Sequence, residues 1–201
     1  RRRESCPAAR APPPSAATAR PRRASPARPL HRRGGHAHVR AGTRGGTRGG
    51  TRGGFVVTWD SYYQDSSNTW GVYGKMYDAE GEAESYEFRV NTTTSSNQYQ
   101  QSVTDLDGGG FVVTWYSDSH SKTFAQIFDR DGSPQGGEFE VSQHSSSYQP
   151  EVARLDGGGF VVTWEDNTTS NDGSGYDIQG QVFDQNGNKV GGEFLANTEI
   201  T

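Results

Sequence analysis

One pentapeptide, Phe-Val-Val-Thr-Trp, occurs three times in this chain of 201 residues. The copies occupy residues 55–59, 111–115 and 160–164, so they begin 56 and 49 residues apart. An identical apolar run that returns after about fifty residues is typical of a repeat protein, in which each copy marks the same place in one structural unit. The sequence therefore predicts an array of equivalent units.

Each unit is predicted to contain four short strands. Around the third copy, residues 148–155 and 160–164 form two strands, joined by the turn Asp156-Gly157-Gly158-Gly159, whose glycines allow positive φ. After a polar loop, residues 178–183 and 193–197 form two more. Short strands joined by hairpin turns make an antiparallel meander. The other units match this pattern, and no helical periodicity appears after Phe55.

The side-chain pattern of the strands predicts how the units pack. Both faces of the Phe-Val-Val-Thr-Trp strand are largely apolar, so we expect it to be covered on both sides. The following strand carries a small residue at matching positions, which allows close backbone approach: Gly74, Ala125 and Gly180. We expect an all-β, β-propeller-like fold of tandem four-stranded meanders, with units at residues 55–106, 107–155 and 156–201. Separate small sandwiches are the alternative, but about fifty residues are too few for each.

The array is expected to be open. A propeller usually has at least about four blades, whereas the marker strand occurs three times. After the fourth strand of the last unit, near Thr201, another first strand would be expected. We therefore expect a longer polypeptide or other chains to complete the array, because an open end presents an edge strand that can associate.

Residues 1–54 differ in composition from the rest. They hold 14 of the 20 Lys and Arg residues and one of the 24 Asp and Glu residues, a local charge of +13, and all 22 aromatic residues lie at or after Phe55. Such a leader cannot bury a core and is predicted to be disordered. Three interpretations stay open: a misread or slipped nucleotide repeat, a plain solvated tail and, least favoured, a basic arm for nucleic acid.

Cysteine usage and hydropathy limit the class of protein. Cys6 is the only cysteine, which excludes a disulfide framework within one chain and a cysteine-based metal site. The sequence has no apolar run of the length that a signal peptide or a membrane span needs. Because the chain starts at Arg1 rather than at Met, we expect the edge of a fragment or gene model, so a missing signal says little about secretion.

The repeated motifs resemble those of a known class of proteins. Asp-Gly-Gly-Gly-Phe-Val-Val-Thr-Trp, then Gln-Val-Phe-Asp-x-x-Gly, then Gly-Gly-Glu-Phe-x-x-Asn is similar to the tandem repeats of large secreted bacterial proteins, which often also carry haemolysin-type (RTX) calcium-binding or cadherin-like segments. The resemblance covers residues 52–201. It implies an extracellular or surface-attached protein with an adhesive or scaffolding role, and it carries over no catalytic residue. The glycine-rich calcium-binding nonapeptides of such proteins are absent.

Two turns begin like a calcium-binding loop, one with Asp129 and Asp131 and the other with Asp184 and Asn186. Calcium needs about six to eight oxygen ligands, and the closing glutamate that an EF-hand would require, Glu140, falls within a predicted strand. Tight turns also favour Asp and Gly. We therefore predict plain turns, with a weak calcium site as the alternative and no other cofactor.

Aromatic residues gather in and near the variable loops that follow the marker strands. The candidates for stacking on sugar rings are Tyr62, Tyr63, Trp70, Tyr116 and Tyr176. Trp70 is the only tryptophan outside the repeated strand and therefore the best single candidate, although it could instead cap the end of a unit. Loops on such scaffolds concentrate function, whereas Trp59, Trp115 and Trp164 recur with the strand and are predicted to be core.

Known catalytic motifs are missing, among them Gly-x-Ser-x-Gly, His-Glu-x-x-His and a phosphate loop. Asn91 and Asn167 begin glycosylation sequons, which matter only in a host that glycosylates. We expect a non-enzymatic extracellular structural or adhesive repeat protein that associates with itself or with neighbouring repeats. The alternative is a lectin-like propeller that binds glycans through the loop aromatics.

Overall fold

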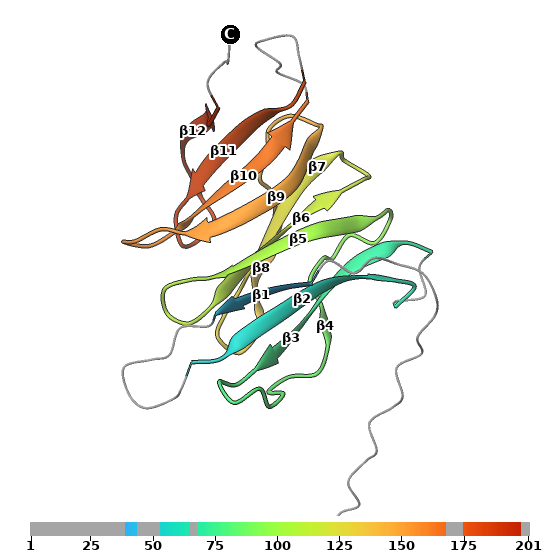
Figure 1. Cartoon of the computed structure of the whole chain (residues 1–201), viewed down its shortest axis with the longest axis vertical. Helices are drawn as coiled ribbons and strands as arrows, with labels where there is room; N and C mark the ends of the chain where they lie inside the picture. Colours follow the sequence, from blue (N-terminus) through green and yellow to red (C-terminus); the bar gives the residue numbers. More distant parts are fainter. Residues whose placement is uncertain (1–38, 44–52, 65–67, 168–174, 198–201) are drawn as a thin grey trace, which may run out of the picture. The chain divides into compact units, whose positions relative to one another are not determined.

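The computed structural model describes residues 39–43, 53–64, 68–167 and 175–197. These residues contain no helix, and none of them therefore forms a helical membrane span. They form three antiparallel sheets of four strands each, and neighbours in sequence pair within each sheet (Figure 1). The expected all-β fold of tandem four-stranded meanders is confirmed.

We call the sheets A, B and C in chain order. Sheet A holds β1 (Val39–Thr43), β2 (Phe55–Tyr62), β3 (Trp70–Tyr77) and β4 (Phe88–Arg89). Sheet B holds β5 (Gln98–Asp105), β6 (Phe111–Ser117), β7 (Lys122–Phe128) and β8 (Pro134–Glu140). Sheet C holds β9 (Ser147–Arg154), β10 (Phe160–Asp166), β11 (Asp177–Phe183) and β12 (Lys189–Leu195).

Each sheet begins one strand earlier than the units predicted from the sequence. The strands β5 and β9 pair with the strands that follow them, through the short hairpins at residues 106–110 and 155–159, so sheets B and C begin near residues 98 and 147. In sheet A the corresponding place is taken by β1, whose residues the sequence analysis assigned to the disordered leader. That assignment is wrong for Val39–Thr43, because pairing with the edge of β2 uses backbone groups and needs no apolar pattern. Residues 1–38 and 44–52 of the leader lie outside the described residues.

The sheets pack face to face in chain order through two apolar cores. The first core joins sheets A and B, and includes Val56, Val72, Met76, Val90, Phe111, Val113, Trp115 and Phe128. The second joins sheets B and C, and includes Val112, Ala125, Ile127, Val141, Phe160, Val162, Trp164 and Phe183. Equivalent positions of the repeat supply both cores, so the chain builds the same interface twice, as successive propeller blades do.

The three marker strands differ in burial although their sequences begin identically. All seven residues of β6 are buried, as a strand covered on both faces requires. In β2 the buried side chains are Val56, Thr58 and Asp60, while Phe55, Val57 and Trp59 are half-buried. In β10 the alternation is reversed. Coverage on both faces is therefore confirmed for the middle sheet only, and Trp59 is less buried than the predicted core role required.

The small residues of the third strand make room for a ring. Thr58, Thr114 and Thr163 of the marker strands face Gly74, Ala125 and Gly180 across the sheet. An added Cβ would lie 2.9 Å from Phe88 Cζ at Gly74 and 2.5 Å from Phe194 Cζ at Gly180. The close approach expected at these positions is therefore made by a phenylalanine side chain of the fourth strand, rather than by backbone.

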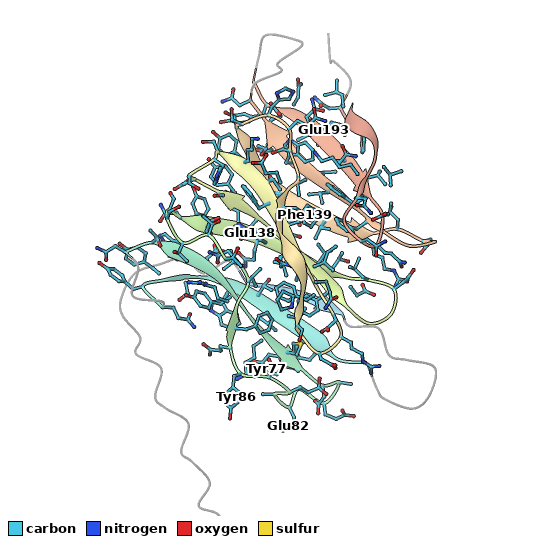
Figure 2. The ribbon with its side chains drawn as sticks, turned by 180° about the vertical axis from the view of Figure 1, so that it is seen from behind. Tyr77, Glu82, Tyr86, Glu138, Phe139 and Glu193 are labelled. Atoms are coloured by element: carbon cyan, nitrogen blue, oxygen red, sulfur yellow. The ribbon has the colours of Figure 1, made fainter. Side chains whose placement is uncertain are left out.

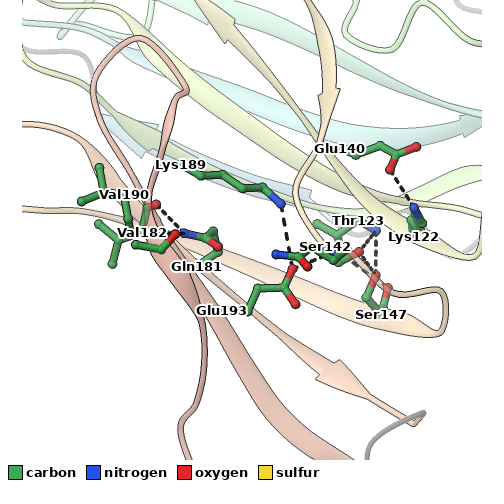
Figure 3. Close-up of polar contacts among 12 residues, drawn as sticks. Lys122, Thr123, Glu140, Ser142, Ser147, Gln181, Val182, Lys189, Val190 and Glu193 are labelled. Carbon is green, nitrogen blue, oxygen red and sulfur yellow. Dashed lines mark hydrogen bonds and ion pairs between the residues drawn. The ribbon is translucent and has the colours of Figure 1, made fainter.

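A glutamine side chain holds the fourth strand of sheets B and C in place. In sheet C, Gln181 Nε2 donates to the carbonyl oxygens of Val182 at 2.9 Å and Val190 at 3.3 Å (Figure 3). Gln126 makes the equivalent bonds in sheet B, and the glycines that follow in the fourth strands, Gly136 and Gly191, both have φ of 71°. Sheet A has Lys75 at this position, and its fourth strand, β4, spans only two residues.

Candidate binding surface at the hairpin end of the sheets

The hairpins β2–β3, β6–β7 and β10–β11 lie at the same end of their meanders, which we call the hairpin end. In sheet A this end carries three of the predicted aromatic candidates side by side. Tyr62 and Trp70 are cross-strand partners with ring centroids 5.4 Å apart, and the rings of Tyr62 and Tyr63 form a T-shaped pair with centroids 4.3 Å apart. Tyr62 is 42% exposed and Tyr63 is 44% exposed. These residues, the aromatic cluster, present ring surface to solvent with Trp70 half-buried behind it.

A row of four tyrosines lies at the hairpin end of sheets B and C. The centroids of Tyr99 and Tyr116 are 5.4 Å apart, those of Tyr116 and Tyr148 are 5.0 Å apart, and those of Tyr148 and Tyr176 are 6.1 Å apart. Tyr176, at the end of the row, is 56% exposed. The structure thus joins two predicted candidates, Tyr116 and Tyr176, through Tyr148, and Tyr99 extends the row beyond Tyr116. The sequence analysis selected neither Tyr99 nor Tyr148.

Polar side chains connect the aromatic cluster to the tyrosine row. Asn97 Oδ1 accepts from the backbone N–H of Trp70 at 3.1 Å, and Asn97 Nδ2 donates to Asp118 Oδ2 at 2.8 Å. The other Asp118 oxygen accepts from the Tyr99 hydroxyl at 2.7 Å. This chain of bonds fixes sheet A to sheet B and places a carboxylate beside the rings.

The phenols of Tyr99 and Tyr116 stay neutral over the physiological pH range. Burial raises the pKa of Tyr99, and its hydrogen bond to the negatively charged Asp118 raises it further. Burial also raises the pKa of Tyr116. Both hydroxyls therefore remain hydrogen-bond donors.

The structure corrects one of the aromatic predictions and adds two residues. Tyr116 is buried between its neighbours, so it supports the row and does not offer a ring face to a ligand. Tyr99 and Tyr148 were missed because they belong to strands rather than to variable loops. Their signal was present in the repeat itself, since both begin the Tyr-Gln segment of the first strand.

The calcium candidates lie at the opposite end of the sheets. Asp129 Oδ1 accepts from the backbone N–H groups of Asp131 and Ser133, both at 2.9 Å, and Asp184 Oδ1 accepts from Asn186 and Asn188 at 2.8 and 2.9 Å. Asn188 therefore helps to lower the pKa of Asp184. Each turn thus uses an aspartate oxygen for its own backbone, as a plain turn does. Among the described residues, no three acidic, histidine or cysteine side chains are grouped to hold a metal.

Three of these candidates border an open groove of about 500 Å³ between sheets B and C. Asp129, Asp131 and Asn186 line it together with residues of the β5–β6 and β11–β12 turns. Its carboxylates are partly engaged, because Asp107 lies 3.4 Å from Arg154, and Asp131 lies 4.0 Å from Arg130. The geometry favours turns over an assembled calcium site.

The two glycosylation sequons have different environments. Asn91 is 2% exposed, its Oδ1 accepts from Val72 N at 2.8 Å, and its Nδ2 donates to Thr93 O at 2.7 Å. The folded chain leaves no room for a glycan on that nitrogen, so the prediction for Asn91 is wrong. Asn167 is exposed, but the remainder of its sequon lies outside the described residues.

The Asn91 sequon instead belongs to the junction between sheets A and B. Glu138 lies on β8 (Figure 2). It accepts from Thr92 N at 2.7 Å and from the Thr93 hydroxyl. Burial alone would raise the pKa of Glu138, but the hydrogen bonds from Thr93 and Thr92 outweigh it and lower the pKa. Glu193 of sheet C occupies the matching position and accepts from Gln143 N at 2.6 Å.

The comparisons with known proteins concern the fold. No family model matches the chain, and no curated protein matches it. A crystal structure of a protein of unknown function from Dyadobacter fermentans DSM 18053 is similar, with a TM-score of 0.56 and 11% identity over 73% of this chain. The match spans 39% of that protein. A thermostable family-43 glycoside hydrolase matches with a TM-score of 0.44 and 9% identity, over 73% of this chain and 55% of the hydrolase. The first likeness shows the fold alone.

Proposed function

We propose that this chain is a non-catalytic adhesive repeat module that binds carbohydrate at the hairpin end of its sheets. The observation that carries the proposal is the aromatic cluster of Tyr62, Tyr63 and Trp70, with its two exposed tyrosines. An aromatic ring offers a broad apolar face, and a tyrosine adds a polar tip, which suits the apolar C–H face and the hydroxyl rim of a sugar.

The polar surroundings of the cluster support the same ligand class. Gln64, the residue after Tyr63, donates from Nε2 to Glu87 at 2.9 Å at the exposed surface. Asp118 and Asn97 lie between the cluster and the tyrosine row, where carboxylate and amide groups can exchange hydrogen bonds with sugar hydroxyls. Apolar and aromatic surface combined with a few precisely placed polar groups is typical of small-ligand sites.

The setting is part of the proposal. The resemblance of the repeats to those of secreted bacterial proteins supports an extracellular or cell-surface location. The stacked sheets would act as a rigid support, because each sheet contacts the next through an apolar core and through bonds such as those of Glu138. The chain would then act in adhesion by binding a glycan at the hairpin end, while the stacked sheets keep their arrangement and hold that end in place.

Binding to a glycan array, followed by titration with the best soluble oligosaccharide, tests the proposal. Trp70→Ala is expected to weaken binding at least about tenfold, because truncating a ring at the centre of a contact commonly removes more than about 1 kcal/mol. Tyr86→Ala is the matched control, since Tyr86 is 94% exposed and lies outside the hairpin end. Absence of binding to every glycan, or equal losses for the two variants, would overturn the proposal.

A further inference from the structure

The two internal interfaces share a defined aromatic arrangement. In sheet B, Phe111 and Phe128 stack with centroids 4.9 Å apart and an interplanar angle of 11°. Phe88 of sheet A packs against this pair, 5.6 Å from Phe128. In sheet C, Phe160 and Phe183 stack at 5.0 Å and 11°, and Phe139 of sheet B lies 5.8 Å from Phe183. Each interface is therefore one phenylalanine placed on a stacked pair.

Sheet C repeats the half of the interface that carries the single phenylalanine. Phe194 occupies the position of Phe88 and Phe139, but it is 41% exposed. On the same face, Val190 is 53% exposed, and Val161 and Val182 are half-buried. Within the described part of the chain, no sheet covers this face, which we call the open face of sheet C.

Sheet A repeats the half that carries the stacked pair. Phe55 and Tyr77 stack with centroids 5.2 Å apart and an interplanar angle of 12°, the geometry of the two buried pairs. Phe55, Val57 and Trp59 on this face are half-buried, whereas their counterparts in sheets B and C are buried. Among the described side chains, no phenylalanine from another sheet lies on the pair.

We infer that two copies of this chain associate head to tail, with the open face of sheet C in one copy packed on the Phe55–Tyr77 face of sheet A in the other. Phe194 then takes the role that Phe88 and Phe139 play inside the chain. The occupant is a second copy because the required surface, a stacked ring pair beside an apolar marker strand, is one that this chain itself presents. The contact continues an interface that the chain already forms twice.

Such an association is heterologous, because different surfaces of the two copies meet. Heterologous contacts build a ring when the rotation between successive copies brings the last copy back to the first, and they build an open filament when it does not. The joint should be weaker than the internal interfaces, because sheet A carries Tyr73, Lys75 and Tyr77 where sheet B carries Phe124, Gln126 and Phe128. A more polar face is typical of surfaces that are also exposed to water.

Light scattering and sedimentation of the full chain over a concentration series test the inference. The expected result is a mass above the 21.9 kDa of one chain, increasing with concentration. Phe194→Asp and Tyr77→Asp should each lower the association constant at least about 100-fold, because either change buries an unpaired charge in the joint. Tyr86→Asp introduces the same charge at a side chain that is 94% exposed and should leave association unchanged. Circular dichroism confirms that each variant is folded.

Mixing the two variants identifies the geometry. Phe194→Asp retains the sheet A face and Tyr77→Asp retains the open face of sheet C, so an equal mixture should form dimers although neither variant does so alone.

A wild-type chain that stays monomeric up to about 1 mM would overturn the inference. So would normal association of Tyr77→Asp, since that result means that two open faces of sheet C meet each other. Val190→Lys serves as a second variant of the open face if Phe194→Asp does not fold. No glycan is present, so this outcome is independent of carbohydrate binding.

Discussion

Equivalent faces of sheets A and C contain nearly the same side chains and have different environments. In sheet A, Val56 and Thr58 are fully buried, and Phe88 packs on sheet B. In sheet C, Val161 and Thr163 are half-buried, and Phe194 is exposed. The repeat places the same residue types at equivalent positions, but the burial of these residues depends on whether another sheet packs on them. The same motif therefore contributes a different amount to the free energy of unfolding in each sheet.

The largest expected effect compares tryptophans of the same pentapeptide. Trp115 is 1% exposed, and its Nε1 donates to Gln98 at 2.9 Å, so Trp115→Ala should lower the free energy of unfolding by about 3–5 kcal/mol. Trp59→Ala should lower it by less than about 2 kcal/mol, because one side of this ring is not fully covered. Urea unfolding at low protein concentration, where chains are separate, measures both values. Equal losses would show that burial does not separate the two positions.

The next effect is pH-dependent and compares Asp60 with Glu165, its equivalent on the open face of sheet C. Burial between sheets A and B raises the pKa of Asp60 from 3.8 to about 7, although the Gln100 backbone N–H partly offsets this effect. A raised pKa means that the folded chain binds the Asp60 proton more tightly than the unfolded chain does. The stabilisation that this proton provides is therefore fully present below pH 3.8 and is lost as the pH rises through about 7.

Asp60→Asn should therefore stabilise the fold at alkaline pH. We expect a gain of roughly 2–4 kcal/mol at about pH 9 and little change at about pH 4, because a shift of one pKa unit corresponds to about 1.4 kcal/mol. Glu165→Gln is the control on the open face, and a surface substitution there should change stability by less than about 0.5 kcal/mol at either pH. Chemical denaturation at the two pH values measures this, and a pH-independent effect of Asp60→Asn contradicts the prediction.

The smallest effect compares the glycines under the two phenylalanine rings. The added Cβ comes closer to the ring at Gly180 than at Gly74, so distance alone predicts that Gly180→Ala is worse. We expect the reverse, because Phe88 is held against sheet B, whereas Phe194 can turn toward solvent. Gly74→Ala should cost about 1–3 kcal/mol and Gly180→Ala less than about 1 kcal/mol. Thermal and urea unfolding of the two variants decide which factor controls the cost.

The turns and strands could be predicted well because their causes are local. Alternating side chains, Asp-Gly turns and the repeated marker strand identified the four-stranded meander from β5 onward. The turn interpretation of Asp129 and Asp184 was similarly local, since each carboxylate bonds the backbone two and four residues later. The strand β1 was missed because the residues 39–43 lack that alternation.

The candidate surface was predicted only in part. Tyr62 and Trp70 were found because both flank one loop and become cross-strand partners in one hairpin. The tyrosine row was not foreseen, since Tyr116 and Tyr148 lie on different sheets. The expectation that an open edge strand associates stays a prediction, and our inference places the association on the faces of sheets A and C.

The sequence by itself determined the strands, their turns and the equivalence of the three sheets, because these follow from side-chain alternation and glycine conformations over a few residues. Tertiary structure alone decided that Trp115 is buried while Trp59 is half-buried. It also decided that the Asn91 side chain accepts a hydrogen bond from the backbone of β3 at Val72. It also decided that Phe194 remains exposed. The physical reason is that burial and hydrogen-bond partners depend on residues from a neighbouring sheet, which a local pattern does not specify.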